Sequence, residues 1–120
     1  MKKILIVEDD SFLKNLESSK LTQSGFEVMS ATSKAEVDAI LAAGLPDVIL
    51  LDLMLPDISG HELLAQFKTD EKTKAIPVIV FSNLSDDVEM KRVMDAGAAA
   101  FMVKSNFTLD DVIEKIESLS

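Results

Sequence analysis

The stretch VILLDLML, from Val48 to Leu55, decides the fold, because a single carboxylate at Asp52 interrupts the most apolar run of the chain. A continuous apolar run of this kind is typical of a parallel strand that is buried on both faces. An ionised carboxylate is costly to bury unless it is paired, hydrogen-bonded or bound to a metal. The stretch therefore predicts a central strand that ends at a polar site containing Asp52.

Three other apolar runs also end in polar residues. Residues 4–7 lead into Glu8-Asp9-Asp10, residues 78–81 end at Ser82, and residues 101–103 end at Lys104. Helical patterns separate these runs, and residues 26–31 form a weaker strand, so we predict five strands alternating with five helices. Right-handed crossovers then favour a doubly wound, flavodoxin-like (βα)5 fold with a parallel sheet in the order 2-1-3-4-5. The polar residues would meet at the carboxyl edge of this sheet, where open α/β sheets place their sites.

The helices show recognisable patterns. The first should turn an apolar stripe inward, formed by Leu13, Leu16 and Leu21. Ser33 and Glu36 have the spacing of a capping box, in which each residue satisfies a backbone donor near the start of the second helix.

Length and composition limit the architecture. The chain has 120 residues, of which 48% are hydrophobic, so we expect one domain over residues 1–120 with no output domain. The absence of cysteine excludes disulfides and thiolate metal sites.

Charge and hydropathy indicate where the chain acts. The apolar run after Met1-Lys2-Lys3 is too short for a secretory signal, and no run approaches a membrane span, so we expect a cytoplasmic protein that does not bind membranes. A net charge of −9, with few clustered basic residues, argues against direct nucleic-acid binding.

The polar residues at the sheet edge suggest phosphoryl chemistry. In the predicted order the first and third strands are neighbours, so Glu8, Asp9 and Asp52 converge and repel one another unless a cation is present. Oxygen ligands favour a hard ion, and Mg²⁺ typically takes one or two carboxylates while keeping water and phosphate oxygens. Lys104 and the Ser82 hydroxyl could then bind phosphoryl oxygens, with Asp52 placed as the nucleophile that forms an acyl phosphate.

The same residues carry a family resemblance. The chain resembles a response-regulator receiver domain over essentially its whole length, through residues 4–10, 51–60, 80–82 and the segment from Gly97 to Lys104. The resemblance implies a two-component signalling switch rather than an enzyme. It also implies that Asp52 accepts phosphate from a histidine kinase or a histidine phosphotransfer protein.

Further roles follow from the resemblance alone. It makes Asp9 the principal Mg²⁺ carboxylate, has Glu8 act largely through metal-bound water, and adds the backbone carbonyl of Met54 as a ligand. Ser82 and Lys104 become the pair that responds to phosphorylation, and Phe101 the aromatic side chain that changes rotamer. The face formed by the fourth helix, fifth strand and fifth helix would then contact a downstream protein, and Asp86, Asp87 and Glu89 suit a basic partner.

Two other classes of protein compete with this interpretation. One is a receiver-like interaction module that binds partners regardless of phosphorylation, although the complete set of Asp9, Asp52 and Lys104 argues against it. The other is an unrelated (βα)5 enzyme or flavoprotein. Glu8-Asp9-Asp10 would repel a flavin phosphate, and the Asp-x-Asp pattern of a haloacid-dehalogenase-type hydrolase is absent after the first strand.

The sequence departs from the family pattern after Lys104, where Ser105 replaces the usual proline of a cis peptide. We predict a cis Lys104–Ser105 peptide, which costs about 3–4 kcal/mol without proline. The alternative is a trans peptide with Lys104 still pointing inward.

Four further positions carry predictions. The resemblance implies that the side chains at positions 54 and 84 influence attack of water on the phosphoryl group, and because Met54 and Leu84 cannot usefully accept a hydrogen bond from that water, a long-lived acyl phosphate is expected. Asp10 either caps the first helix or assists the metal site. His61, the only histidine, is expected to be a solvated residue at the start of a helix.

Overall fold

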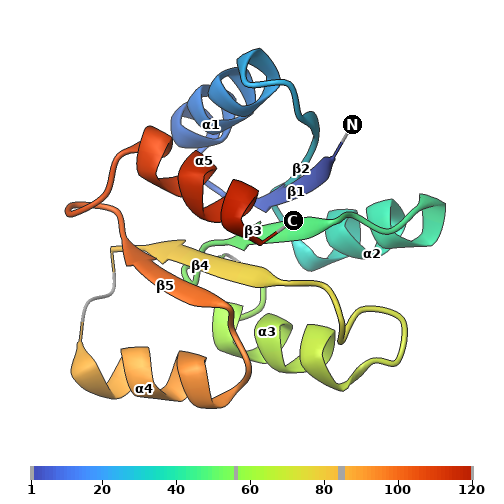
Figure 1. The fold of residues 1–120 in the computed structure, drawn as a ribbon. Coiled ribbons are helices and arrows are strands. Elements are labelled where there is room, and N and C mark those ends of the chain that lie inside the picture. Colours follow the sequence, from blue (N-terminus) through green and yellow to red (C-terminus); the bar gives the residue numbers. More distant parts are fainter. Residues whose placement is uncertain (1, 56, 84–85, 120) are drawn as a thin grey trace.

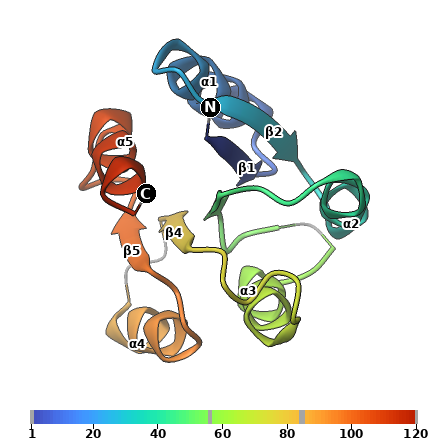
Figure 2. The same cartoon turned by 45° about the vertical axis from the view of Figure 1, so that its right-hand side comes forward.

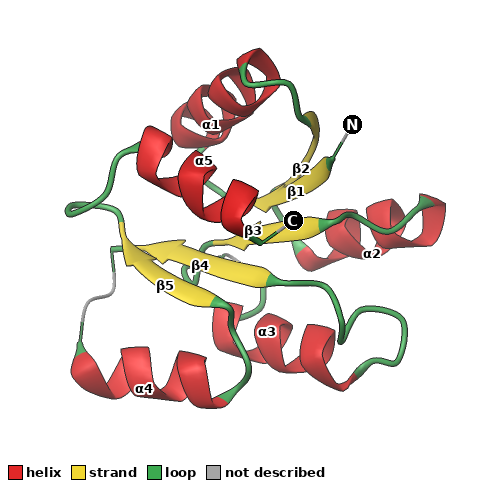
Figure 3. Ribbon diagram, in the orientation of Figure 1, coloured by secondary structure: helices red, strands yellow, loops and turns green. Residues whose placement is uncertain are grey.

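The computed structural model describes residues 2–55, 57–83 and 86–119, along which strands and helices alternate (Figures 1 and 3). The elements are β1 (Lys3–Val7), α1 (Ser11–Gln23), β2 (Glu27–Ala31), α2 (Lys34–Ala43), β3 (Val48–Leu51), α3 (Gly60–Thr69), β4 (Val78–Ser82), α4 (Asp87–Asp95), β5 (Ala100–Val103) and α5 (Leu109–Ser118).

All strand pairs are parallel, and the sheet order is β2-β1-β3-β4-β5. The predicted (βα)5 architecture and strand order are therefore confirmed. Helices α1 and α5 cover one face of the sheet, and α2, α3 and α4 cover the other (Figures 1 and 2). Parallel strands need such crossover connections, which place helices over both faces.

The apolar runs are continuous because successive side chains enter two different cores. In β3, Val48 and Leu50 belong to the core beneath α1 and α5, whereas Ile49 and Leu51 belong to the core on the other face. Strands β1 and β4 divide their side chains in the same way. Because side chains alternate along a strand, burial of both faces requires an apolar residue at every position.

Helix α1 turns a different stripe inward from the one predicted. Its buried residues are Glu17 and Leu21, Leu13 is partly buried, and Leu16 is 48% exposed. The prediction for Leu16 was therefore wrong. The inward stripe follows the i, i+4 spacing of Leu13, Glu17 and Leu21, so a carboxylate occupies a core-facing position.

The helix N-termini are satisfied by side chains, although not always those expected. Asp10 caps α1 by accepting a hydrogen bond from the Leu13 amide at 3.1 Å, which confirms the capping role, one of the two predicted for it. Ser33 accepts from the Glu36 amide, but the Glu36 carboxylate accepts from the amide of Thr32 instead of completing a capping box. These contacts occupy backbone donors that have no partner within the helix.

None of the helices in the described parts of the chain is long and apolar enough to cross a bilayer.

Candidate phosphoryl-accepting site

The pairing of β1 with β3 brings Glu8 and Asp52 together. Val7 lies opposite Leu51 in the register, and the next residue on each strand is Glu8 or Asp52. The Asp52 amide donates to the Val7 carbonyl at 2.9 Å, which extends the ladder to the base of the site. The two carboxylates therefore begin from fixed neighbouring backbone positions at the carboxyl edge of the sheet.

The pairing of β4 with β5 supplies the other two polar groups. Ser82 lies opposite Val103, and the Lys104 amide donates to the Ser82 carbonyl at 2.9 Å. The lysine side chain then extends back to the acidic pair. Its Nζ lies 3.0 Å from both carboxylate oxygens of Glu8 and 3.0 Å from Oδ2 of Asp52.

Several hydrogen-bond donors hold the Asp52 carboxylate. The Ser82 hydroxyl and the Met54 amide each donate to Oδ1 at 3.1 Å, and the Lys104 ammonium donates to Oδ2. Asp52 is only 7% exposed, so these contacts fix its orientation in a largely dry site. A carboxylate oriented in this way is suited to act as a nucleophile or an electrostatic anchor.

The two acids at the site differ in their affinity for a proton. Burial, together with the adjacent Asp52, raises the pKa of Glu8 from 4.5 to about 8. Burial alone would raise the pKa of Asp52, but hydrogen bonds from Glu8, the Met54 amide and Lys104 hold it below its ordinary range. Burial alone would lower the pKa of Lys104, but Glu8 and Asp52 raise it. Of the two acids, Asp52 therefore releases its proton more readily than Glu8.

The predicted acidic cluster forms. One oxygen from each of Glu8, Asp9 and Asp52 lies within 4.8 Å of the others, with Asp9 exposed and the other two acids buried. Three carboxylate oxygens at this separation suit a hard divalent cation that keeps some of its water. The exposed position of Asp9 leaves this side of the cluster open to solvent.

The Lys104–Ser105 peptide is trans, so the predicted cis geometry was wrong. Lys104 nevertheless points inward, as the stated alternative required. Its four-carbon stem reaches the acids without a special backbone turn, so nothing offsets the cost of a cis bond here.

The segment after Asp52 is held close to the sheet by Gly60. Its amide donates to the Leu53 carbonyl at 2.9 Å, and a Cβ at this position would lie 2.8 Å from the Asp52 carbonyl oxygen. Only glycine permits the start of α3 to approach the Asp52 backbone so closely.

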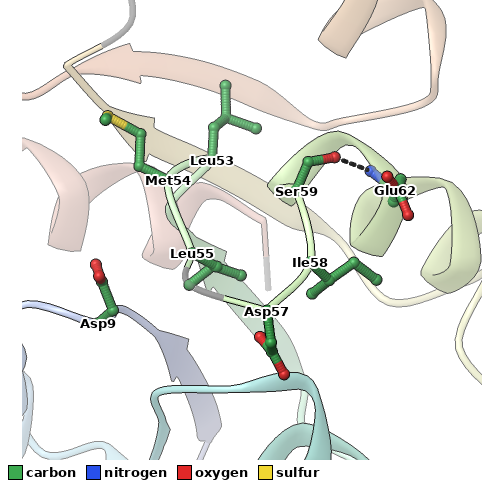
Figure 4. Close-up of a pocket in the computed structure, with 8 residues that line it drawn as sticks. All are labelled: Asp9, Leu53, Met54, Leu55, Asp57, Ile58, Ser59 and Glu62. Carbon is green, nitrogen blue, oxygen red and sulfur yellow. Dashed lines mark hydrogen bonds between the residues drawn. The ribbon is translucent and has the colours of Figure 1, made fainter.

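An open cavity of about 570 Å³ adjoins the site, between Asp9 and the residues that connect β3 to α3 (Figure 4). Asp57 anchors this connection because its Oδ2 accepts a hydrogen bond from the Lys34 amide at 3.0 Å. The cavity therefore opens the site to solvent on the side of Asp9.

The remaining predicted residues have mixed outcomes. Phe101 is partly buried and packs against the core beneath α2, α3 and α4, and Met54 is exposed. Leu84 lies outside the described residues. His61 is not a solvated residue, because its side chain is only 12% exposed and its Nε2 contacts the carboxylate of Glu89 on α4.

Sequence reasoning missed Glu17, which is 2% exposed. It lines a cavity of about 170 Å³ together with Lys104 and the ring of Phe81. Burial raises the pKa of Glu17 from 4.5 to about 7. Its position four residues from both Leu13 and Leu21 was the signal that could have identified it.

Comparison with known proteins agrees with this geometry. The response regulator receiver domain family matches residues 4–117, and the chain belongs to this family. The DNA-binding dual master transcriptional regulator RpaA of Synechocystis is 30% identical over 119 residues, which are 99% of this chain and 49% of that protein. The polar-differentiation response regulator DivK of Brucella ovis is 31% identical over 117 residues, covering 98% of this chain and 94% of that protein. The chain thus spans about half the length of some curated relatives and nearly all of another.

A solved structure shares the fold. The manganese-bound form of response regulator Rcp1 superposes with a TM-score of 0.81 and 26% identity, covering 99% of this chain and 91% of that chain. The chain is therefore a receiver domain of two-component signalling, which is a signalling switch, and it carries the acidic cluster typical of such domains.

Proposed function

We propose that this receiver domain takes a phosphoryl group onto Asp52 in a Mg²⁺-dependent reaction and thereby changes the surface that it presents to a partner. The observation that carries the proposal is the Asp52 carboxylate, which is buried at a strand end and held by donors from Ser82, Met54 and Lys104. The phosphoryl donor would be a histidine kinase or a histidine phosphotransfer protein, as membership of the family implies.

The site favours Asp52 as the nucleophile over its acidic neighbours. Its lowered pKa keeps it ionised, whereas the raised pKa of Glu8 favours the protonated form. Attack by an Asp52 oxygen forms an oxygen–phosphorus bond as the nitrogen–phosphorus bond of the donor histidine breaks. The leaving imidazole then takes up a proton.

Glu8, Asp9, Asp52 and the Met54 backbone carbonyl would hold Mg²⁺. The fit rests on the three carboxylate oxygens that lie within 4.8 Å of one another. When bound, the ion offsets the negative charge of the carboxylates and of the incoming phosphoryl group. Asp9 contributes the exposed carboxylate, and Glu8 acts largely through a metal-bound water.

Lys104 and Ser82 would stabilise the transferred group. Both already contact Asp52, on different carboxylate oxygens, so a phosphoryl group on Asp52 arrives within reach of an ammonium and a hydroxyl. Ser82 would move toward the phosphoryl group, and Phe101 would then change rotamer within the core beneath α4. Without a polar side chain at Met54 or Leu84 to hold an attacking water, the acyl phosphate should be long-lived.

The surface of α4, β5 and α5 would contact the downstream protein. Of the acidic side chains around the start of α4, Glu89 contacts His61, and Asp86 caps the helix by accepting a hydrogen bond from the Val88 amide. Asp87 and the 72% exposed Val88 remain as a small acidic and apolar surface. This surface suits a partner with a basic residue beside an apolar one.

Incubation with acetyl phosphate and Mg²⁺, followed by intact-mass measurement, tests the proposal. The wild-type protein should gain the mass of one phosphoryl group, and Asp52→Asn should gain none. Asp57→Asn is the matched control, because Asp57 is an exposed acid on the same connection and its partner, the Lys34 amide, can still donate to asparagine. Undiminished labelling of Asp52→Asn, or no labelling of the wild type, would reject the proposal.

A further inference from the structure

Glu17 is a buried acid to which the proposed reaction assigns no role. Its side chain is almost completely buried, and it lines a small cavity behind the site. A carboxylate is costly to bury, so its presence on a core-facing helix stripe requires an explanation. The position lies midway along the inward stripe of α1, where an apolar residue would satisfy the fold.

The cavity beside Glu17 connects it to the site. It has a volume of about 170 Å³, and its walls are mainly apolar, with Glu17 and Lys104 as the charged groups that line it. Lys104 also lies beneath the Phe81 ring, with Nζ 5.9 Å from the ring centroid. The lysine therefore lies between two environments: Glu8 and Asp52 at the site, and Glu17 across the cavity.

The charges around Glu17 come from several elements. Lys104, at the end of β5, favours its ionised form, while Asp52, at the end of β3, and Asp10, at the start of α1, oppose it. Glu8, after β1, is held by Lys104. On α5, Asp110 is paired with Lys20 at 3.2 Å and is exposed. Lys104 is thus the favourable partner for a charge on Glu17.

We propose that Glu17 is a positioning residue that limits how much of the Lys104 charge is available to a phosphoryl group on Asp52. The proposal rests on the proposed function. Ionised Glu17 attracts the ammonium from the cavity side and repels the negative charge that arrives at Asp52. Protonated Glu17 does neither, so Lys104 then interacts fully with the site. Because the surroundings are apolar, this interaction is poorly screened.

The proposal predicts a pH-dependent effect of Glu17→Gln. Below the raised pKa of Glu17 the wild-type side chain is neutral and resembles glutamine, so the two proteins should react at similar rates at about pH 5.5. At about pH 8.5 the variant lacks a buried negative charge, and its rate should be several-fold higher, because a charge in apolar surroundings is poorly screened.

The experiment measures phosphorylation by acetyl phosphate with Mg²⁺ at both pH values, as the ratio of the variant rate to the wild-type rate. Because acetyl phosphate and the other titrating groups are the same in both measurements, their effects of pH on the rate cancel in the ratio. Glu114→Gln is the matched control, because it removes an exposed acid from α5, and its ratio should not change with pH. A Glu17→Gln ratio that is the same at both pH values, or that Glu114→Gln reproduces, would overturn the proposal.

A second readout does not depend on phosphorylation. The Glu17 carboxyl carbon can be titrated by NMR in the wild type and in Lys104→Met. Loss of the ammonium should shift the Glu17 titration to higher pH, because Lys104 favours the charged form. An unchanged midpoint would show that the two groups are not coupled. If the wild type accepts no phosphoryl group, the proposed function fails, and this titration still decides whether Glu17 acts on Lys104.

Discussion

Replacing Glu17 with leucine should stabilise the domain, and the gain should depend on pH. Burial raises the pKa of Glu17 from 4.5 to about 7. One pKa unit corresponds to about 1.4 kcal/mol, so keeping this carboxylate ionised in the folded state costs about 3 kcal/mol above that pKa. Between these two pKa values the folded protein retains a proton that the unfolded chain releases, so Glu17 lowers stability progressively as the pH rises. Below the lower value it imposes no such cost.

Urea unfolding of the wild type and Glu17→Leu at about pH 5 and pH 8 measures the effect. Glu17→Leu should raise the free energy of unfolding, and the part of this increase that depends on pH should be below about 1 kcal/mol at pH 5 and about 3 kcal/mol at pH 8. Glu8, whose raised pKa acts in the same direction, titrates in both proteins and cancels in the comparison. Glu17→Gln separates loss of charge from added apolar contact. An equal gain at both pH values, or a loss of stability at pH 8, would refute the reasoning.

Three further predictions concern the surroundings of the site. Gly60→Ala should lower the free energy of unfolding by about 1–3 kcal/mol in urea titrations, because its Cβ would lie 2.8 Å from the Asp52 carbonyl oxygen; an unchanged midpoint would show that the start of α3 can move away. His61→Ala should cost about 1–2 kcal/mol by leaving Glu89 without its partner, and a double-mutant cycle with Glu89→Gln should show coupling; additive effects would count against the pair. Asp9→Ala should raise the free energy of unfolding in the absence of metal, because it relieves repulsion among the carboxylates. The variant should also lose the stabilisation by Mg²⁺, which is about 0.4 kcal/mol in the wild type when the Mg²⁺ concentration equals a Kd near 1 mM. A wild-type melting temperature that does not change with Mg²⁺ would contradict the metal site.

Much of the fold could be predicted because strand burial leaves a direct pattern in the sequence. The apolar runs 4–7, 48–51 and 78–81 supply side chains to two cores, and each run ends where a polar residue enters the site. Once the strand order was predicted, the convergence of Glu8 with Asp52 followed, because these residues come directly after paired positions.

The features that were missed depend on details that the pattern does not encode. Leu16 and Glu17 are adjacent, and an apolar stripe can be drawn through either because the helical repeat is not a whole number of residues. Apolarity favoured Leu16, yet tertiary packing turned Glu17 inward. His61 was assigned to solvent because its partner, Glu89, lies on a different helix, and local sequence does not reveal contacts between α3 and α4.

Identification of the phosphorylated residue tests the central claim most directly. An acyl phosphate on an aspartate is reduced by borohydride to homoserine, which changes the mass of the peptide that contains it. After treatment with acetyl phosphate and Mg²⁺, peptide mass spectrometry should find homoserine at Asp52 and unmodified aspartate at Asp9, Asp10 and Asp57. Homoserine at another position with Asp52 unchanged would contradict the assignment of Asp52 as the phosphoryl acceptor.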